Sequence, residues 1–206
     1  MTLLDTHPRL NPLLSRPIRG AIFDCDGTLA DTMGLHYQAW VRALADRGAA
    51  MSENLFYELG GVQTHRIVAI LNERLGRTLD VEETAAAKEA LYEALLPQAP
   101  PIQPVIDVVY SLHGRYPLAV ASGGLRRLVN RTLAELGLTH LFQAVCTAED
   151  VVHGKPAPDL FLLAASRIRI APADCAVFED SDLGLEAARR AGMQGIDIRP
   201  WLRQSE

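Results

Sequence analysis

The chain has 206 residues, of which 49% are hydrophobic and 22% charged, and this composition is typical of a globular protein. Its net charge of −5 argues against a surface that binds nucleic acid or an anionic membrane. No apolar run approaches the roughly 20 residues that a membrane-spanning helix needs. We therefore expect a monomeric cytoplasmic protein with neither nucleic-acid nor membrane partners.

Residues 1–18 are expected to form a loosely attached tail, because prolines interrupt them and no continuous apolar stretch marks a signal peptide. The three cysteines have neither CxxC nor metal-binding spacing, and each lies in or beside an apolar run: Cys25, Cys146 and Cys175. This pattern predicts buried thiols in a reducing compartment.

The most informative stretch runs from Ala21 to Asp31. Its apolar run, Ala21 to Phe23, predicts a buried strand of a parallel sheet, and two aspartates follow it. If the strand continues, Asp24 and Asp26 project together at its carboxyl end, where open α/β sheets bind ligands. Two adjacent carboxylates repel each other, so the pair predicts a cation, Mg²⁺, between them. A carboxylate can also attack phosphorus, whereas an Asp-rich turn would need no chemistry.

After Asp31 the pattern becomes helical as far as about residue 100. Four helices are expected there, delimited by start and stop residues: Gly48 after the first, Ser52 before the second, Gly76 after the third and Asp80 before the fourth. The proline-rich segment Pro97 to Pro104 then indicates a linker.

From Val105 onward, apolar strands alternate with helical segments. The strands are expected near residues 118–121, 144–146, 175–178 and 195–198. This alternation predicts an α/β fold with a doubly wound parallel sheet, which the strand near residue 22 has to join. The helical block is then an insertion. We expect a core domain of residues 19–32 plus 101–206 and a small α-helical cap domain of residues 33–100.

Two more strands are followed by polar groups. The hydroxyl of Ser122 and the amide of Gly123 follow an apolar strand near a helix start, a setting that suits a phosphate oxygen. Glu179 and Asp180 end a buried strand and offer oxygen ligands for a hard cation. Taken singly, the first pair could be an ordinary loop and the second could be helix capping.

Lysine is rare in this chain, since only Lys88 and Lys155 occur among 20 basic residues. A lysine that remains can mark a position where a compact ammonium is required and a planar guanidinium does not serve. Lys155 lies in a loop and would alone be read as a solvated lysine. Lys88 lies in a helix that we expect to be exposed, so the inference is weak there.

In type, order and setting, these segments resemble the four motifs of the haloacid dehalogenase-like superfamily of phosphotransferases. The resemblance implies that Asp24 is the nucleophile and Asp26 the general acid/base. It further implies that the transferring phosphoryl group is held by Ser122, Gly123 and Lys155. It assigns Mg²⁺ to Asp24, Asp26, Glu179 and Asp180, with position 26 coordinating through its backbone carbonyl.

The helical insertion resembles the cap of the β-phosphoglucomutase-like subfamily. By this resemblance, the cap residues that contact substrate are His36, Trp40, Thr64 and Arg66, although packing alone could explain the first two. The stretch from Pro117 onward resembles bacterial sugar-phosphate phosphatases of the fructose-1-phosphate type. The resemblance implies a Mg²⁺-dependent phosphatase that hydrolyses a small sugar phosphate, of the fructose-1-phosphate or 6-phosphogluconate type, through an aspartyl-phosphate.

Two alternatives stay open. A sugar phosphomutase must anchor a second phosphate, and the mutase cap does so with cations flanking a Gly-Val pair. Here Gly61 and Val62 are flanked by Gly60 and Thr64, which carry no charge, while His65 and Arg66 lie close enough to substitute in part. The remote alternative is a non-catalytic phosphosugar-binding protein, but such proteins usually lose a nucleophile or metal ligand, and every motif group is present here.

Overall fold

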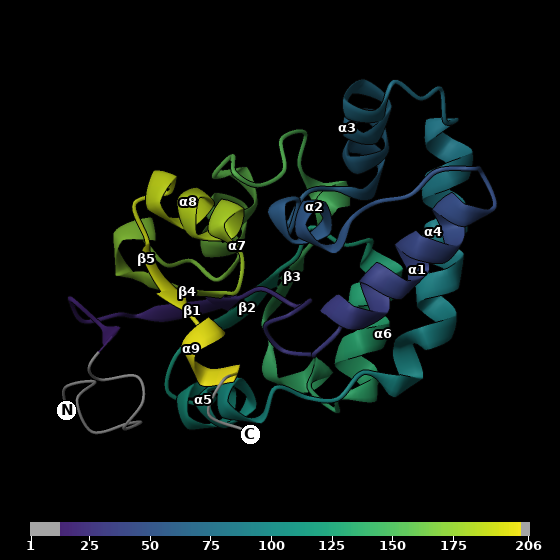
Figure 1. Cartoon of the computed structure of the whole chain (residues 1–206). Helices are drawn as coiled ribbons and strands as arrows, with labels where there is room; N and C mark the ends of the chain where they lie inside the picture. Colours follow the sequence, from purple (N-terminus) through teal and green to yellow (C-terminus); the bar gives the residue numbers. More distant parts are fainter. Residues whose placement is uncertain (1–12, 203–206) are drawn as a thin grey trace.

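The computed structural model describes residues 13–202 of the chain. A five-stranded, entirely parallel sheet forms the centre of the larger unit, in the order β3-β2-β1-β4-β5 (Figure 1). Its strands are β1 (Gly20–Phe23), β2 (Leu118–Ala121), β3 (Ala144–Cys146), β4 (Cys175–Glu179) and β5 (Gln194–Asp197). The expected α/β class with a parallel sheet is confirmed.

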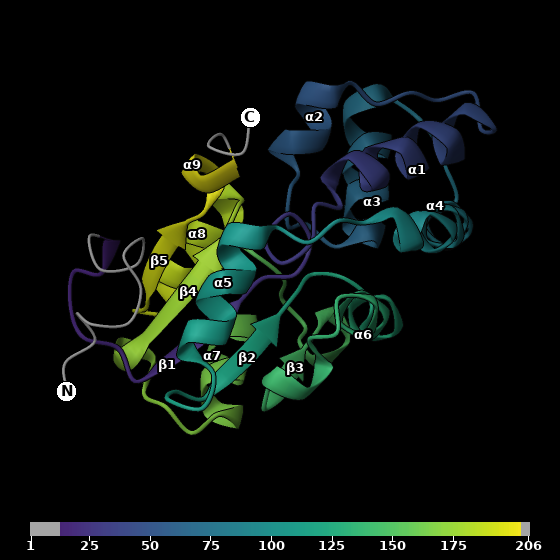
Figure 2. The same ribbon diagram turned by 90° about the horizontal axis from the view of Figure 1, so that it is seen from below.

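Helices cover both faces of the sheet (Figure 2). One face packs against α5 (Gln103–Leu112), α6 (Arg126–Glu135) and the short α9 (Arg199–Leu202). The opposite face packs against α7 (Asp159–Arg167) and α8 (Asp182–Arg190). Because side chains alternate along a strand, Phe23 contributes to the first cluster and Ile22 to the second. All four residues of β1 are buried, as expected for a central parallel strand.

The remaining helices form a second unit around a hydrophobic cluster of their own. They are α1 (Met33–Ala45), α2 (Glu53–Glu58), α3 (Thr64–Leu75) and α4 (Val81–Leu95). Three expected boundary residues cap these helices. Ser52 accepts a hydrogen bond from Leu55 N at 3.3 Å, Asp80 accepts one from Glu83 N at 2.8 Å, and Gly76 ends α3 in the left-handed conformation.

The two chain crossings between these units run side by side. Asp31 N donates to Pro100 O at 2.9 Å, and Ile102 N donates to Leu29 O at 3.0 Å. A short 3₁₀ turn, Leu96–Gln98, precedes the return crossing. The division into a core and a cap stays our proposal, and the expected boundaries near residues 33 and 100 fall beside this hydrogen-bonded pair.

The expected tail, residues 1–18, is fastened to the core over the part that the structure describes. Ser15 N and Arg16 N donate to the side-chain carbonyl of Gln194 at 2.9 and 3.1 Å, and Gln194 Nε2 returns a bond to Arg16 O. The Ile18 side chain is buried in the core. Residues 1–12 lie outside the described residues. A loose attachment is therefore wrong for residues 15–18, because a buried glutamine of β5 binds the backbone of Ser15 and Arg16 and Ile18 packs into the core.

The expectation of buried thiols is confirmed. All three cysteines are free and buried. Within residues 13–202, no helix combines the length and the apolar character needed to cross a membrane.

Candidate active site

Asp24 follows the last residue of β1 and is 5% exposed. Since β1 lies between β2 and β4, the polar groups that end those strands come together beside it. Lys155 Nζ donates to Asp24 Oδ1 at 2.6 Å and to Glu179 Oε2 at 3.1 Å. One buried ammonium thus links carboxylates that end two neighbouring strands.

Asp24, Glu179 and Asp180 form a cluster of three carboxylates, one oxygen from each lying within 4.8 Å of the others. Burial, with the charge of Glu179, raises the pKa of the Asp24 carboxyl well above its usual range. The same two causes raise the pKa of Asp180 to about 7. Three carboxylates share the single ammonium of Lys155 here, so positive charge is lacking when they are ionised. Hard oxygen donors at this spacing fit a divalent cation such as Mg²⁺.

Two glycines make room for this cluster. Gly27 has a φ of 83°, and a Cβ there would overlap the Asp180 carboxylate. A Cβ at Gly184 would overlap the Glu179 carboxylate. Thr28 Oγ1 donates to Asp180 Oδ1 at 3.2 Å, and Ser181 caps α8 by accepting from Gly184 N at 3.1 Å. Gly27 and Thr28 of the Asp-x-Asp-Gly-Thr sequence therefore lie against the carboxylate of Asp180, which follows β4.

The Asp26 carboxylate turns away from the cluster and toward the helical unit. Its Oδ1 accepts hydrogen bonds from Tyr92 Oη at 2.8 Å and Thr32 Oγ1 at 2.9 Å, and His36 Nε2 lies 3.3 Å away. Ser122 Oγ donates more weakly to Oδ2 at 3.4 Å. Burial alone would raise the pKa of Asp26, but the hydrogen bonds from His36, Tyr92 and Thr32 hold it below its usual range.

The expectation of a cation between the carboxylates of Asp24 and Asp26 is therefore corrected. β1 ends at Phe23, so the strand alternation that would align the two side chains no longer applies at residue 26. The carboxylate cluster instead draws Glu179 and Asp180 from β4 and the loop after it. Coordination by the Asp26 backbone carbonyl stays a prediction.

Lys88 is buried against His36, not exposed on a surface helix as expected. Its Nζ lies 2.8 Å from His36 Nδ1 and is 5.0 Å from the centre of the Tyr92 ring. Since an ammonium only donates, His36 Nδ1 is the acceptor and the Nε2 proton faces Asp26. Burial lowers the pKa of Lys88, and burial together with Lys88 lowers the pKa of His36. A neutral imidazole therefore connects Lys88 to Asp26.

The loop after β2 lies directly under the helical unit. Ser122 Oγ is buried and accepts from Gly124 N at 3.0 Å. A Cβ at Gly123 would lie 3.0 Å from Gly61 O, and one at Gly61 would lie 3.4 Å from Lys155 Cδ. Gly61 has a φ of 82°, which favours glycine. The tight approach of these glycines closes the helical unit over the carboxylate cluster.

Most of the predicted site residues line one pocket between the two units. These are Asp24, Asp26, His36, Trp40, Thr64, Ser122, Gly123, Glu179 and Asp180. Lys155 lies beside the pocket, since its Nζ donates to Asp24, which lines it. Trp40 also belongs to the hydrophobic cluster of the helical unit, so packing and pocket lining both apply to it.

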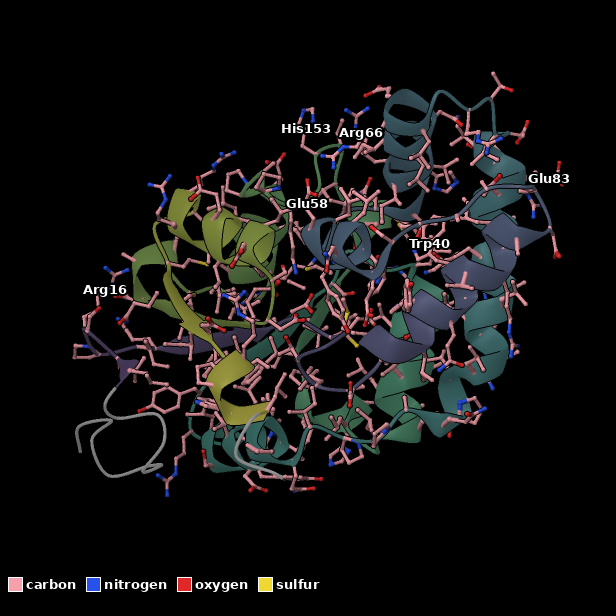
Figure 3. All side chains as sticks on the ribbon, viewed as in Figure 1. Arg16, Trp40, Glu58, Arg66, Glu83 and His153 are labelled. Carbon is pink, nitrogen blue, oxygen red and sulfur yellow. The ribbon has the colours of Figure 1, made fainter. Side chains whose placement is uncertain are left out.

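Arg66 is the predicted residue that this geometry does not bring to the pocket. It is exposed and is not among the pocket-lining residues. Figure 3 shows Arg66 at the outer edge of the molecule, whereas Trp40 lies within the helical unit. The expectation that Thr64 and Arg66 both approach the substrate is corrected, because residues two apart on a helix do not share a face.

Sequence reasoning missed three pocket residues on α4: Lys88, Glu89 and Tyr92. Glu89 accepts from Lys88 Nζ at 3.2 Å and from the Thr64 hydroxyl. Two features of the sequence could have indicated these residues. Lys88 is one of only two lysines, and Tyr92 follows it by four residues, which places both on the same helix face.

A family model described as haloacid dehalogenase-like hydrolase matches residues 18–192. The chain belongs to this family. This haloacid dehalogenase-like hydrolase is 44% identical over 181 residues to "Fructose-1-phosphate phosphatase YqaB" of Escherichia coli strain K12, covering 87% of this chain and 96% of the relative. It is 31% identical over 183 residues to "Phosphorylated carbohydrates phosphatase" of Thermotoga maritima, covering 87% and 84%.

Solved structures agree on the architecture. β-Phosphoglucomutase from Clostridium difficile matches this haloacid dehalogenase-like hydrolase with a TM-score of 0.77 at 23% identity, covering 87% of this chain and 84% of that one. At this level of identity the likeness shows the fold alone. The expected superfamily, its fold and an enzyme of the hydrolase class are confirmed.

Proposed function

We propose that this protein is a Mg²⁺-dependent phosphatase that hydrolyses a small sugar phosphate through an aspartyl-phosphate on Asp24. The observation that carries the proposal is the contrast between two carboxylates two residues apart. Asp24 contacts Lys155 beside the acid cluster, and Asp26 contacts His36 and Tyr92 at the sugar side of the pocket. The two relatives named above are both phosphatases, one of them of fructose 1-phosphate.

Asp24 is suited to attack phosphorus, because its carboxylate is buried at the strand end and held by Lys155 Nζ. Lys155, the Ser122 hydroxyl and the Gly123 amide lie around the position that a phosphoryl group would take, and they stabilise its oxygens by charge and position. Mg²⁺, when bound, supplies positive charge that offsets the repulsion between nucleophile and phosphate; its proposed ligands are Asp24, Glu179, Asp180 and the Asp26 carbonyl.

Asp26 is suited to act as general acid and then general base. It protonates the leaving sugar oxygen, and it later takes a proton from the water that attacks the aspartyl-phosphate. The hydrogen bonds from Tyr92, Thr32 and His36 fix the carboxylate toward the pocket. They stabilise its anionic form, which the second step requires, so Asp26 has to take up the proton for the first step against this stabilisation.

The pocket favours hydrolysis over the mutase reaction, in which the phosphoryl group is transferred back to a different hydroxyl of the sugar. A mutase has to anchor a second phosphate, and Lys88 is the only lysine or arginine among the described residues that line the pocket. Its charge is offset by Glu89, and Arg66 lies outside the pocket. The presence of all the motif groups likewise disfavours a non-catalytic binding protein. A monomeric state and a cytoplasmic location stay predictions.

The test is phosphate release from fructose 1-phosphate by the purified protein. Release should require Mg²⁺, stop with EDTA and return when Mg²⁺ is restored. Asp24→Asn should reduce turnover to background, because an amide is neither the nucleophile nor an anionic metal ligand. Near-normal turnover by Asp24→Asn would overturn the proposal. Formation of glucose 6-phosphate from β-glucose 1-phosphate faster than phosphate release would favour the mutase.

A further inference from the structure

Glu89 is a buried carboxylate in the wall of the sugar pocket that none of the catalytic steps above uses. Its side chain is 8% exposed, lies on α4 and lines the pocket. Acidic side chains are rarely buried unless they are paired. Lys88 is the partner of Glu89, since its Nζ lies 3.2 Å from Glu89 Oε1.

The hydrogen bonds of Glu89 are unevenly distributed between its two oxygens. Oε1 accepts from both Lys88 Nζ and the Thr64 hydroxyl. Oε2 has no hydrogen-bond partner among residues 13–202. An ionised carboxylate only accepts hydrogen bonds, so Oε2 is complementary to a group with a hydrogen to donate. A sugar hydroxyl has such a hydrogen, whereas an ionised carboxylate has none and a second phosphate is mostly dianionic at neutral pH.

The balance of charges in the pocket wall also favours a substrate without a second anionic group. Lys88 is the single lysine or arginine among the described lining residues, and Glu89 offsets its charge at contact distance. Lys155 is committed to Asp24 and Glu179 on the core side. A second anionic group on the substrate would therefore find no unpaired cation in this wall and would face the Glu89 carboxylate in a partly desolvated pocket.

We propose that Glu89 selects for phosphorylated sugars whose remaining groups are uncharged hydroxyls, and against sugar acids and bisphosphates. The selection has two parts: Oε2 accepts from a sugar hydroxyl, and the negative charge cancels Lys88 and repels a second anion. This inference rests on the proposed phosphatase function and deepens it. Of the two substrate types expected from sequence, it favours the fructose-1-phosphate type over the 6-phosphogluconate type.

The test compares kcat/KM for 6-phosphogluconate with kcat/KM for fructose 1-phosphate in the full chain with Mg²⁺. The ratio of the two cancels any general loss of catalytic competence. Glu89→Gln keeps the shape but removes the charge and leaves Lys88 unpaired, so the ratio should rise about tenfold or more. Glu89→Asp keeps the charge, and its ratio should stay within about threefold of the wild type.

Glu82→Gln is the matched control, because Glu82 lies on the same helix and its side chain is 85% exposed outside the pocket. Its ratio should equal that of the wild type. Should Glu89→Gln fold poorly, Glu89→Met replaces it, and the same rise in the ratio is expected. A ratio within threefold of the wild type in the uncharged variants overturns the inference alone. Wild-type protein that releases phosphate from neither sugar overturns the proposed function, and the inference with it.

Discussion

Tyr92 Oη donates a hydrogen bond of 2.8 Å to Asp26 Oδ1 and so joins helix α4 of the inserted unit to the loop after β1. The tyrosine is 1% exposed, and its ring stacks on His36 with centroids 3.7 Å apart. The residue proposed as acid/base is therefore positioned from the helical unit as well as from the sheet.

Tyr92→Phe should lower kcat by about threefold to tenfold, because it removes one hydrogen bond to an ionised group while keeping the ring. The bond holds the pKa of Asp26 down, so its loss should raise that pKa. The acid limb of the pH–rate profile should then move to higher pH. The exposed Tyr57→Phe serves as control. An unchanged acid limb in Tyr92→Phe would show that the bond does not act on Asp26.

Lys155→Arg should fail nearly as completely as Lys155→Ala in turnover of p-nitrophenyl phosphate. The Lys155 side chain is 1% exposed and its ammonium contacts two carboxylates, so a guanidinium fork does not fit. Both variants should also be less stable, by about 3–5 kcal/mol, since buried carboxylates lose their partner. Full activity of the arginine variant would mark Lys155 as dispensable for the chemistry.

Arg66→Ala should leave KM for fructose 1-phosphate within about twofold of the wild type, because Arg66 is exposed outside the pocket. Thr64→Val should raise that KM severalfold, since the lost hydroxyl holds Glu89 in the pocket wall. Steady-state kinetics on both variants checks this pair. A large KM effect confined to Arg66→Ala would mean that the helical unit presents α3 differently when substrate binds.

Asp150→Asn should destabilise the protein by about 1–2 kcal/mol at pH 7 and far less near pH 2. Burial would raise the pKa of Asp150, but Arg167, at 2.8 Å, leads the contacts that lower it from 3.8 to about 2. The folded-state pKa is depressed, so this stabilisation is present above pH 4 and is lost as pH falls toward 2. Urea unfolding at several pH values measures it, with the exposed Asp46→Asn as control. A pH-independent difference would contradict the ion-pair explanation.

The sequence alone located the motif residues, for a physical reason that is local. An apolar run that ends in polar residues marks the end of a buried strand, and parallel strands present these ends at one edge of the sheet. Asp24, Ser122 and Glu179 therefore could be placed together without coordinates. Lys155 followed from the rarity of lysine and from the order of the motifs, and the structure shows its ammonium bonded to Asp24 and Glu179.

Only the tertiary structure decided which side chains of the inserted helices reach the site. Lys88 was expected on an exposed helix, but α4 packs against both α1 and α3, and this packing buries it beside His36. The side chains of Thr64 and Arg66 point in different directions, because both residues lie on α3, which begins at Thr64, and residues two apart on a helix do not share a face. Asp26 turns from the carboxylate cluster toward Tyr92 because β1 has already ended. Such orientations depend on where an element stops and on what packs against it, and neither is fixed by local residue patterns.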